Sequence, residues 1–413
     1  MKHTRIQRYL PALLAAILTL TLFSGCSSAP TSPDAGKMVA YIDETGLMLR
    51  RLDGEESVQL AKGTRLAAPV FSGDGKYVYF KNTSDMFSVS TDGGRAMLAA
   101  ADAVYLREWN GKALFLSRTT GVTAYDPTAN TSETVIAQPE TGNIGAMSLS
   151  PDGTRAVYSV EMIDAGVQRL MSVCVTVPGA AEPDIYPASM FPSARSVTPL
   201  AWSPDGRVCY LGIGDSDGAF IALYAFSVFD GSLSNLSGRV PLIPTASEIH
   251  VSDDGSVLVA AAYKVAADAF ESLLVVDLKA GSFSYQTAGY APIVGTTVSA
   301  DGRLIAYGLG ETLETAYGVY VNNGEKTLRI CSDTDGVNVC YPTFSGDGQT
   351  LYFLDFSGET PALCRGKSNT AGYTPLLDGI TVPDGTYRKT MRDCIAIYDP
   401  APVTAPAAKT TAE

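Results

Sequence analysis

Side chains suited to acid–base or nucleophilic chemistry are sparse in this sequence. Only two histidines occur, His3 and His250, and His250 lies in a short apolar run that is typical of a strand rather than of a catalytic site. The segment Gly214-Asp-Ser-Asp-Gly218 matches the Gly-x-Ser-x-Gly pattern of a hydrolase nucleophile. That nucleophile must open a helix, whereas the apolar run from Phe220 to Phe229 predicts a strand, so we interpret the segment as a hairpin.

Potential metal ligands are equally scattered. One histidine outside the N-terminal segment cannot build the His-rich or Cys/His sites of zinc or copper. The segment Asp333-Thr-Asp335-Gly336 begins like a calcium loop, but Phe344 stands where the liganding Glu is expected. Because Asp-Gly pairs are also ordinary turn residues, we expect neither a metal nor a cofactor.

Carboxylates are the one abundant type of catalytic group, with 43 Asp and Glu residues. Glycosidases use two carboxyl groups about 5–10 Å apart, and such a pair could face the central funnel of a ring-shaped fold. A carbohydrate-active hydrolase or lyase that uses Asp, Glu and Tyr is therefore one functional hypothesis. No particular pair stands out, so no catalytic residue is predicted.

The elements that must position these side chains are repeated along the chain. One pattern recurs six times: an apolar strand, a Ser-x-Asp-Gly turn and a second apolar strand. Two weaker copies occur at a similar spacing. The spacing runs from 36 residues (Asp74 to Asn110) to 53 residues (Asp152 to Asp205). The turns are Ser72-Gly-Asp-Gly75, Ser150-Pro-Asp-Gly153, Ser203-Pro-Asp-Gly206, Ser252-Asp-Asp-Gly255, Ser299-Ala-Asp-Gly302 and Ser345-Gly-Asp-Gly348, with the weaker copies Glu108-Trp-Asn-Gly111 and Val382-Pro-Asp-Gly385.

Each repeat predicts a four-stranded antiparallel sheet. Alternating segments such as Lys76-Tyr-Val-Tyr-Phe80 follow the turns and are typical of strands. A third strand, a second turn and a shorter polar strand come next. Such units, repeated at this period around a ring, form an all-β β-propeller.

The turns resemble the WD40-like (PD40) repeat of the TolB family, in which Ser-Pro-Asp-Gly precedes a β-branched and aromatic strand. Ser150–Gly153 and Ser203–Gly206 match that pattern fully, and the other copies replace the proline. The resemblance covers about residues 38–398 and implies the propeller fold without naming a function. TolB-like propellers resemble those of prolyl-oligopeptidase-type peptidases, whose triad lies in a separate hydrolase domain that we do not expect here.

Eight blades are predicted, with seven as the alternative because the copy at Asn110 is degenerate. The segment from Met38 to Leu60 reads as three strands that lack a first one. Either Ile380–Val382 or Cys394–Tyr398 could supply the missing strand. The ring would then be closed by strands from both ends of the chain.

The longest interval contains residues 176–200, which carry five prolines. Loops on a rigid scaffold often hold binding residues, so Tyr186, Met190 and Phe191 are candidates for a contact surface. The alternative is a longer fourth strand followed by a proline-stiffened connection.

The N-terminus predicts export and lipid attachment. Lys2, Arg5 and Arg8 precede an apolar stretch of signal-peptide length. The segment Leu22-Phe-Ser-Gly-Cys26 resembles a bacterial lipobox, which implies lipidation of Cys26. We therefore expect a signal peptide at 1–25, a flexible tether at 26–37, the propeller at 38–399 and a disordered tail at 400–413.

Charge and cysteine content fit an extracytoplasmic protein. The formal net charge of −13 disfavours nucleic acid as a partner. Six cysteines remain besides Cys26, and an exported protein permits disulfides. A Cys331–Cys340 bridge is one alternative, and buried free thiols are the other.

These features favour a lipoprotein of the bacterial cell membrane that faces away from the cytoplasm. We expect its propeller to be a non-catalytic binding scaffold and a monomer, attached to the membrane only through its lipid. The expected partner is an envelope protein, a peptide or a cell-wall polymer.

Overall fold

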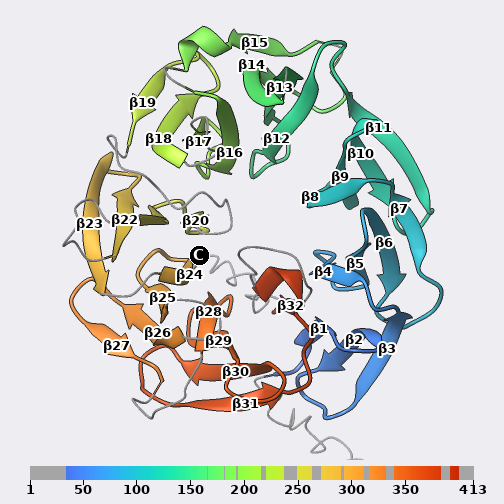
Figure 1. Ribbon diagram of the computed structural model, residues 1–413, viewed down its shortest axis with the longest axis vertical. Helices are drawn as coiled ribbons and strands as arrows, with labels where there is room; N and C mark the ends of the chain where they lie inside the picture. Colours follow the sequence, from blue (N-terminus) through green and yellow to red (C-terminus); the bar gives the residue numbers. More distant parts are fainter. Residues whose placement is uncertain are drawn as a thin grey trace, which may run out of the picture.

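A computed structural model describes residues 34–164, 166–180, 182–191, 194–214, 220–236, 249–262, 271–289, 293–310, 316–331, 339–382 and 391–399 of the chain. These residues form eight four-stranded antiparallel sheets that surround a central axis (Figure 1). The protein is thus an all-β propeller of eight blades, as the repeats predict. In each blade the first strand lies nearest the axis and the fourth lies outermost.

Seven blades follow the chain in simple order. Their strands are β4 (Leu66–Phe71), β5 (Tyr77–Asn82), β6 (Asp85–Ser90) and β7 (Met97–Ala100); β8 (Ala103–Trp109), β9 (Lys112–Ser117), β10 (Gly121–Asp126) and β11 (Thr131–Ala137); β12 (Asn143–Leu149), β13 (Ala156–Asp164), β14 (Val167–Thr176) and β15 (Asp184–Pro187); β16 (Ser196–Trp202), β17 (Val208–Gly214), β18 (Phe220–Ser227) and β19 (Leu233–Asn235); β20 (Ile249–Val251), β21 (Val257–Ala262), β22 (Glu271–Asp277) and β23 (Ser282–Gly289); β24 (Ile293–Val298), β25 (Ile305–Gly310), β26 (Ala316–Asn322) and β27 (Thr327–Arg329); and β28 (Val339–Phe344), β29 (Thr350–Asp355), β30 (Ala362–Lys367) and β31 (Tyr373–Leu377).

The eighth blade joins the two ends of the chain. It consists of β32 (Ile395–Tyr398), β1 (Met38–Ile42), β2 (Gly46–Arg51) and β3 (Ser57–Lys62), with β32 nearest the axis. Strand β32 pairs antiparallel with β1, so that Tyr398 lies opposite Met38. Of the two predicted closing segments, Cys394–Tyr398 is confirmed, whereas Ile380–Val382 forms no strand.

Hydrogen bonds fix each Ser-x-Asp-Gly turn. In all six copies the Ser hydroxyl donates to the Asp carboxylate at 2.6–2.8 Å. The same oxygen accepts a backbone N–H from the start of the second strand at 2.9–3.0 Å. The glycine has φ between 61° and 71°, a left-handed conformation that costs a glycine little. The turn chemistry predicted from the sequence is therefore present in every copy.

These turns also join neighbouring blades. A Cβ atom on Gly75 would lie 2.7 Å from the Tyr398 ring, and one on Gly153 would lie 2.6 Å from the Trp109 ring. Glycine thus lets a side chain of the adjacent blade lie directly on the turn. All six turns connect a first strand to a second, so they lie on one face of the ring, which we call the turn face.

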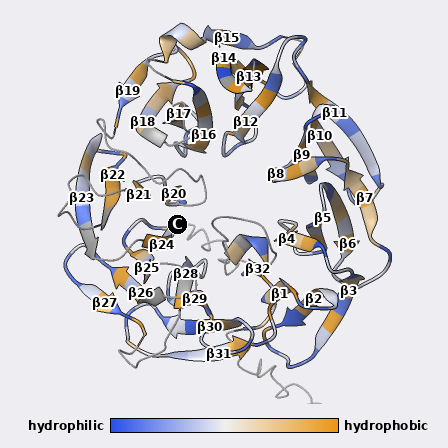
Figure 2. Cartoon of the chain, in the orientation of Figure 1, coloured by the Kyte–Doolittle hydropathy of each residue, from blue (hydrophilic) through white to orange (hydrophobic). Residues whose placement is uncertain are grey.

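Apolar side chains fill the spaces between blades. Tyr79 and Phe115, from adjacent blades, pack edge to face with ring centroids 5.7 Å apart, and both are fully buried. Val157 and Phe226 belong to a cluster that spans the next pair of blades. Figure 2 shows that outer strands such as β11 and β15 are more hydrophilic than the strands inside them.

The ends of the described chain pack onto the propeller. Asp34 accepts a hydrogen bond from the Arg365 guanidinium at 2.7 Å, and Lys37 pairs with Asp399 at 3.2 Å. Residues 34–37, which the sequence assigns to the tether, are therefore held against the propeller by charge pairs that composition alone does not reveal. The predicted signal peptide, the rest of the tether and the tail lie outside the described residues.

The cysteine side chains that the structure describes are buried and free: Cys174, Cys209, Cys331, Cys364 and Cys394. The alternative of a Cys331–Cys340 disulfide is thus not realised. Helical structure in the described ranges is limited to short 3-10 turns such as η1 (Ala188–Met190) and η3 (Met391–Asp393). Within the same ranges, no helix has the length and hydropathy needed to cross a membrane.

Candidate functional site

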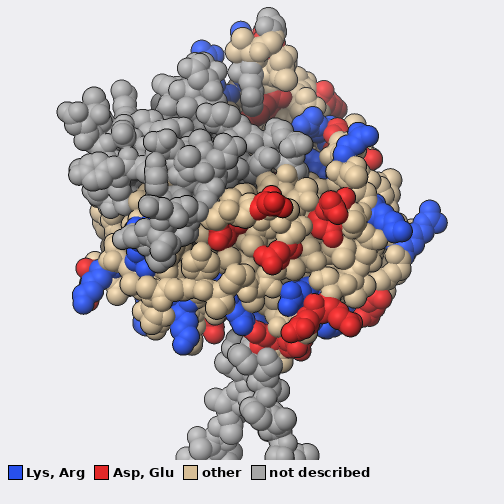
Figure 3. All heavy atoms as spheres, turned by 60° about the horizontal axis from the view of Figure 1, so that its bottom comes forward, with Lys and Arg blue, Asp and Glu red and all other residues tan. Residues whose placement is uncertain are grey.

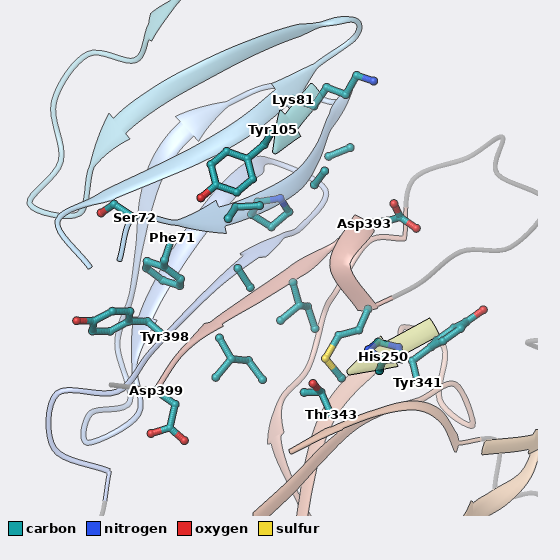
Figure 4. A pocket seen from close by; sticks show the side chains of 18 of the residues that line it. Phe71, Ser72, Lys81, Tyr105, His250, Tyr341, Thr343, Asp393, Tyr398 and Asp399 are labelled. Carbon is teal, nitrogen blue, oxygen red and sulfur yellow. The ribbon is translucent and has the colours of Figure 1, made fainter. Parts of the chain in front are cut away.

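A hollow of the described structure lies on the propeller axis. It has a volume of about 1030 Å³ and opens between the first strands of several blades. Strands β4, β8, β20, β24, β28 and β32 contribute to its wall (Figure 4). The lining comprises residues 67–73, 104–106, 295–296, 341–344 and 395–399, together with Lys81, Met86, His250, Gly346, Met391 and Asp393.

The wall of this axial cavity is mostly small, apolar or aromatic. Val70, Phe71, Leu106 and Ile397 come from three different blades and line the same space. Each first strand pairs with the second strand of its blade and with no other strand, so its free edge faces the axis. The cavity therefore offers both apolar side chains and backbone groups that lie outside the sheet ladders.

Bulges interrupt several of these first strands at similar positions along the propeller axis. The pairing register shifts between Ala67 and Val70 in β4, between Ile293 and Thr296 in β24, and between Cys340 and Thr343 in β28. Bulges re-aim side chains and are frequent beside functional sites. Here they turn the backbone of three blades toward the cavity.

The bulges share an unusual backbone conformation. Ala68, Gly295 and Tyr341 have φ values of 49°, 88° and 56°, and each lies four residues before its turn serine. A positive φ is rare for alanine and rarer for an aromatic residue. Such strain persists only where the surroundings hold it, and it clusters at functional sites.

Glycine is required at one of these positions for a second reason. A Cβ atom on Gly295 would lie 2.9 Å from the Cα atom of Tyr341 on the adjacent blade. The bulges of β24 and β28 therefore touch through their backbones. This contact sets the shape of the cavity wall between them.

Polar groups are placed at both ends of the cavity. Figure 4 shows Ser72, Tyr398 and Asp399 toward one end, and Lys81 and Asp393 toward the other. Ser72 begins a turn, so the first end lies at the turn face. Lys81 pairs with Ala67 at the start of β4, so the second end opens at the opposite face, which we call the distal face.

Tyrosine hydroxyls contribute polarity without charge. Tyr105 lines the cavity, and burial, with the negative charge of Glu108, raises the pKa of Tyr105 above its ordinary value. The Tyr105 hydroxyl is therefore un-ionised over the physiological pH range. It can donate and accept hydrogen bonds but does not act as a phenolate.

A smaller hollow of about 520 Å³ adjoins the axial cavity between β8, β12 and β16, and the two share Tyr105 and Leu106. Arg107 lines it, but its guanidinium donates to the backbone carbonyls of Leu149 and Ser150 in the next blade. The charge of Arg107 is thus used to join blades.

The three contact candidates from the sequence lie away from the cavity, at the outer edge of one blade. Tyr186 on β15 is half-buried and packs edge to face on Phe226, with ring centroids 5.1 Å apart. Phe191 is 2 % exposed and also packs near Phe226, while Met190 is 37 % exposed. The structure gives two of the three a packing role and leaves Met190 at the surface.

The other sequence motifs are placed as follows. His250 is a strand residue of β20, as predicted, but its side chain also lines the axial cavity, which the sequence did not indicate. Gly214 ends β17, whereas Ser216, Asp333 and Asp335 lie outside the described residues, as does Cys26. Across the part of the chain that the structure describes, no three His, Cys, Asp or Glu side chains gather as a metal site would require.

Comparison with known proteins gives fold similarity only. No protein-family model matches the sequence, and no curated protein matches it. Among solved structures, the dihydro-heme d1 dehydrogenase NirN in complex with DHE has a TM-score of 0.60 at 12% identity, covering 88% of this chain and 75% of its own. An oligogalacturonate lyase in complex with manganese has a TM-score of 0.51 at 12% identity, covering 83% and 96%.

TolB proteins are also among the similar structures. The putative TolB from Agrobacterium tumefaciens has a TM-score of 0.40 at 12% identity, covering 88% of this chain and 98% of its own. The two structures with TM-scores above 0.5 show a similarity in fold. At such identities the comparison establishes architecture and leaves the function to the site.

Proposed function

We propose that this protein is a lipid-anchored propeller of the bacterial cell envelope that binds a peptide or protein segment in its axial cavity and performs no chemistry on it. The observation that carries the proposal is the cavity itself, at about 1030 Å³ with a largely apolar and aromatic wall. Binding sites are typically of this size and lining, with a few placed polar groups.

The free edges of the first strands favour an extended polypeptide as the ligand. A peptide can bond to unpaired backbone groups at a strand edge while its side chains enter adjoining pockets. The strained bulges at Ala68, Gly295 and Tyr341 bring the backbone of three blades to the cavity wall. A cell-wall polymer would use the same polar groups but would gain less from the apolar wall.

Photo-crosslinking in living cells tests this proposal. A benzophenone side chain at Thr343, which lines the cavity, is expected to capture a discrete partner segment that mass spectrometry can identify. A benzophenone at Val58, which is exposed on the outer strand β3, is the matched control. Filling the cavity by Val70→Trp should abolish the Thr343 adduct. An adduct that persists in the filled variant would contradict cavity binding.

A carbohydrate-active lyase or hydrolase remains the second candidate. Asp393, Tyr105 and Tyr341 line the same cavity, and an oligogalacturonate lyase shares the fold. Purified protein would be assayed on a panel of uronic-acid and neutral oligosaccharides. Turnover that Asp393→Asn or Tyr105→Phe abolishes would establish an enzyme, whereas an inactive but folded protein would support the binding role.

A further inference from the structure

Both ends of the described chain leave the propeller at the turn face. Asp399 directly follows β32, and its carboxylate accepts a hydrogen bond from the backbone N–H of Gly346, inside a Ser-x-Asp-Gly turn, at 3.4 Å. Lys37 directly precedes β1 and pairs with Asp399 at 3.2 Å. The two side chains are only 17% and 14% exposed. This ion pair therefore fixes both ends at one face of the ring.

A second contact fixes the chain still closer to the N-terminus. Asp34, 15% exposed, meets Arg365 of the adjacent blade at 2.7 Å. Arg365 lies in the half of β30 that leads to the turn face. Seven residues lie between Cys26 and Asp34, so the two are eight steps apart along the chain, at most about 28 Å when fully extended.

The geometry points to a preferred orientation at the membrane, with the turn face toward the bilayer and the distal mouth of the axial cavity directed outward. This inference rests on the proposed lipid at Cys26. A six- or seven-residue strand is about 20 Å long, so a tether that starts at the turn face brings the distal face to the bilayer only when most of its length is extended along the side of the propeller. The ligand of the cavity must then be a water-soluble or wall-borne segment that arrives from outside, not a membrane lipid.

Charge on the turn face does not oppose this arrangement. Three of its turn aspartates pair with cations on the same face: Asp74 with Lys76, Asp254 with Lys279 and Asp301 with Arg303. Figure 3 shows acidic and basic side chains interspersed on the described surface. Because the pairs reduce the net charge of the turn face, anionic headgroups repel it only weakly.

Energy transfer from the protein to the bilayer tests the orientation. Full-length lipidated protein would be reconstituted into vesicles that carry an acceptor dye on the lipid headgroup. Donor dyes would be attached at Lys76→Cys or Lys326→Cys on the turn face, and at Val167→Cys or Glu359→Cys on the distal face. These positions are solvent-exposed, and unsubstituted protein measures background labelling of the native cysteines.

We expect a large loss of donor emission from both turn-face positions and a small loss from both distal positions. Lengthening the tether by a flexible Gly-Ser insert after Ser28 should reduce the difference between the faces. Equal or reversed transfer from an acylated protein would overturn the orientation while leaving the anchor intact. Absence of an acyl group on Cys26, measured by mass spectrometry on the same sample, would overturn the anchor and the orientation together.

Discussion

At the residue scale, the turn serine makes hydrogen bonds to two different parts of the chain. Ser150 is fully buried, donates to Asp152 at 2.6 Å and accepts the backbone N–H of Arg155 at 2.9 Å. One hydroxyl therefore ties the turn to the start of the second strand. This dual use explains why Ser accompanies Asp-Gly in the turns.

Replacing that serine tests its contribution. Ser150→Ala removes the acceptor for the Arg155 N–H, and an unsatisfied buried donor costs about 1–3 kcal/mol. We expect the free energy of unfolding in urea to fall by that amount. Ser234→Ala, on the exposed outer strand β19, is the control and should change it by less than about 0.5 kcal/mol. A loss as small as the control's would show that the hydroxyl is dispensable.

The turn aspartates predict how stability depends on pH. Hydrogen bonds, led by that from the Ser hydroxyl, lower the pKa of Asp152, Asp205, Asp301 and Asp347. A hydrogen bond from Ser227, with others from Ser232, lowers the pKa of Asp230 to about 2. A lowered folded-state pKa stabilises the fold above the unfolded value of about 3.9, and this stabilisation is lost as pH falls through the folded value.

We therefore expect the unfolding temperature to be steady from pH 7 to 5 and to fall steeply below about pH 4. The Asp152→Asn variant should be less stable than the parent at pH 7, and the difference should shrink as the pH falls through the lowered pKa of the parent's carboxyl and that carboxyl becomes protonated. Calorimetry across this range measures both curves. Parallel curves for the parent and the variant would contradict the assignment.

At the element scale, the first strands have two roles, since they begin each blade and wall the cavity. The repeat predicts which segments most of these are, because six of the eight lead directly to a turn serine. The bulges at Ala68, Gly295 and Tyr341 were not predictable, since alanine and tyrosine carry no sequence signal for positive φ. His250 was recognised as a strand residue, but its place in the cavity depends on strands from five other blades.

At the outer strands, the sequence suggested a contact surface where the structure shows packing between blades. Tyr186 and Phe191 lie in a proline-rich stretch that resembles an exposed loop. The structure packs both against Phe226 of the next blade, because the longer segment folds back over an apolar interface. Whether these two side chains are buried depends on their contact with Phe226, which is distant in the sequence, so local composition cannot predict it.

Truncation tests the closing strand. A chain that ends at Asp393 loses β32, leaves one edge of β1 unpaired and removes the buried Cys394 and Ile395. Burial of a large apolar side chain is worth about 1.5–3 kcal/mol, so we expect a loss of several kcal/mol and of cooperative unfolding. A chain that ends at Asp399 should unfold like the full chain in circular dichroism. If both truncations behave alike, closure by β32 does not hold the ring.

At the scale of the whole molecule, the fold follows from the repeat, whereas the location stays a prediction from the N-terminal segment. Six Ser-x-Asp-Gly turns and the weaker copy at Asn110 mark seven of the eight blades, which is enough to predict a closed ring. The repeat does not predict the function, because the choice of ligand depends on a few cavity-lining side chains that differ between blades.

Membrane attachment is the prediction that belongs to this scale. Cys26→Ser should release the protein from the membrane fraction and eliminate incorporation of a labelled fatty acid, because we expect the lipid on Cys26 to be the attachment and an acidic protein to bind anionic lipid poorly. Both are measured after fractionation of cells that express the full chain. Ser27→Ala is the matched control and should stay membrane-bound. Retention of the Cys26→Ser protein would contradict anchoring through lipid alone.

The pairing of β1 with β32 has a consequence for the order of folding. Met38 is synthesised early, but its partner strand arrives only with the final residues of the fold. Until then the nascent chain carries an open strand edge that can anneal with other polypeptides. We therefore expect the chain to acquire protease resistance in a single late step, after residue 398 has been made.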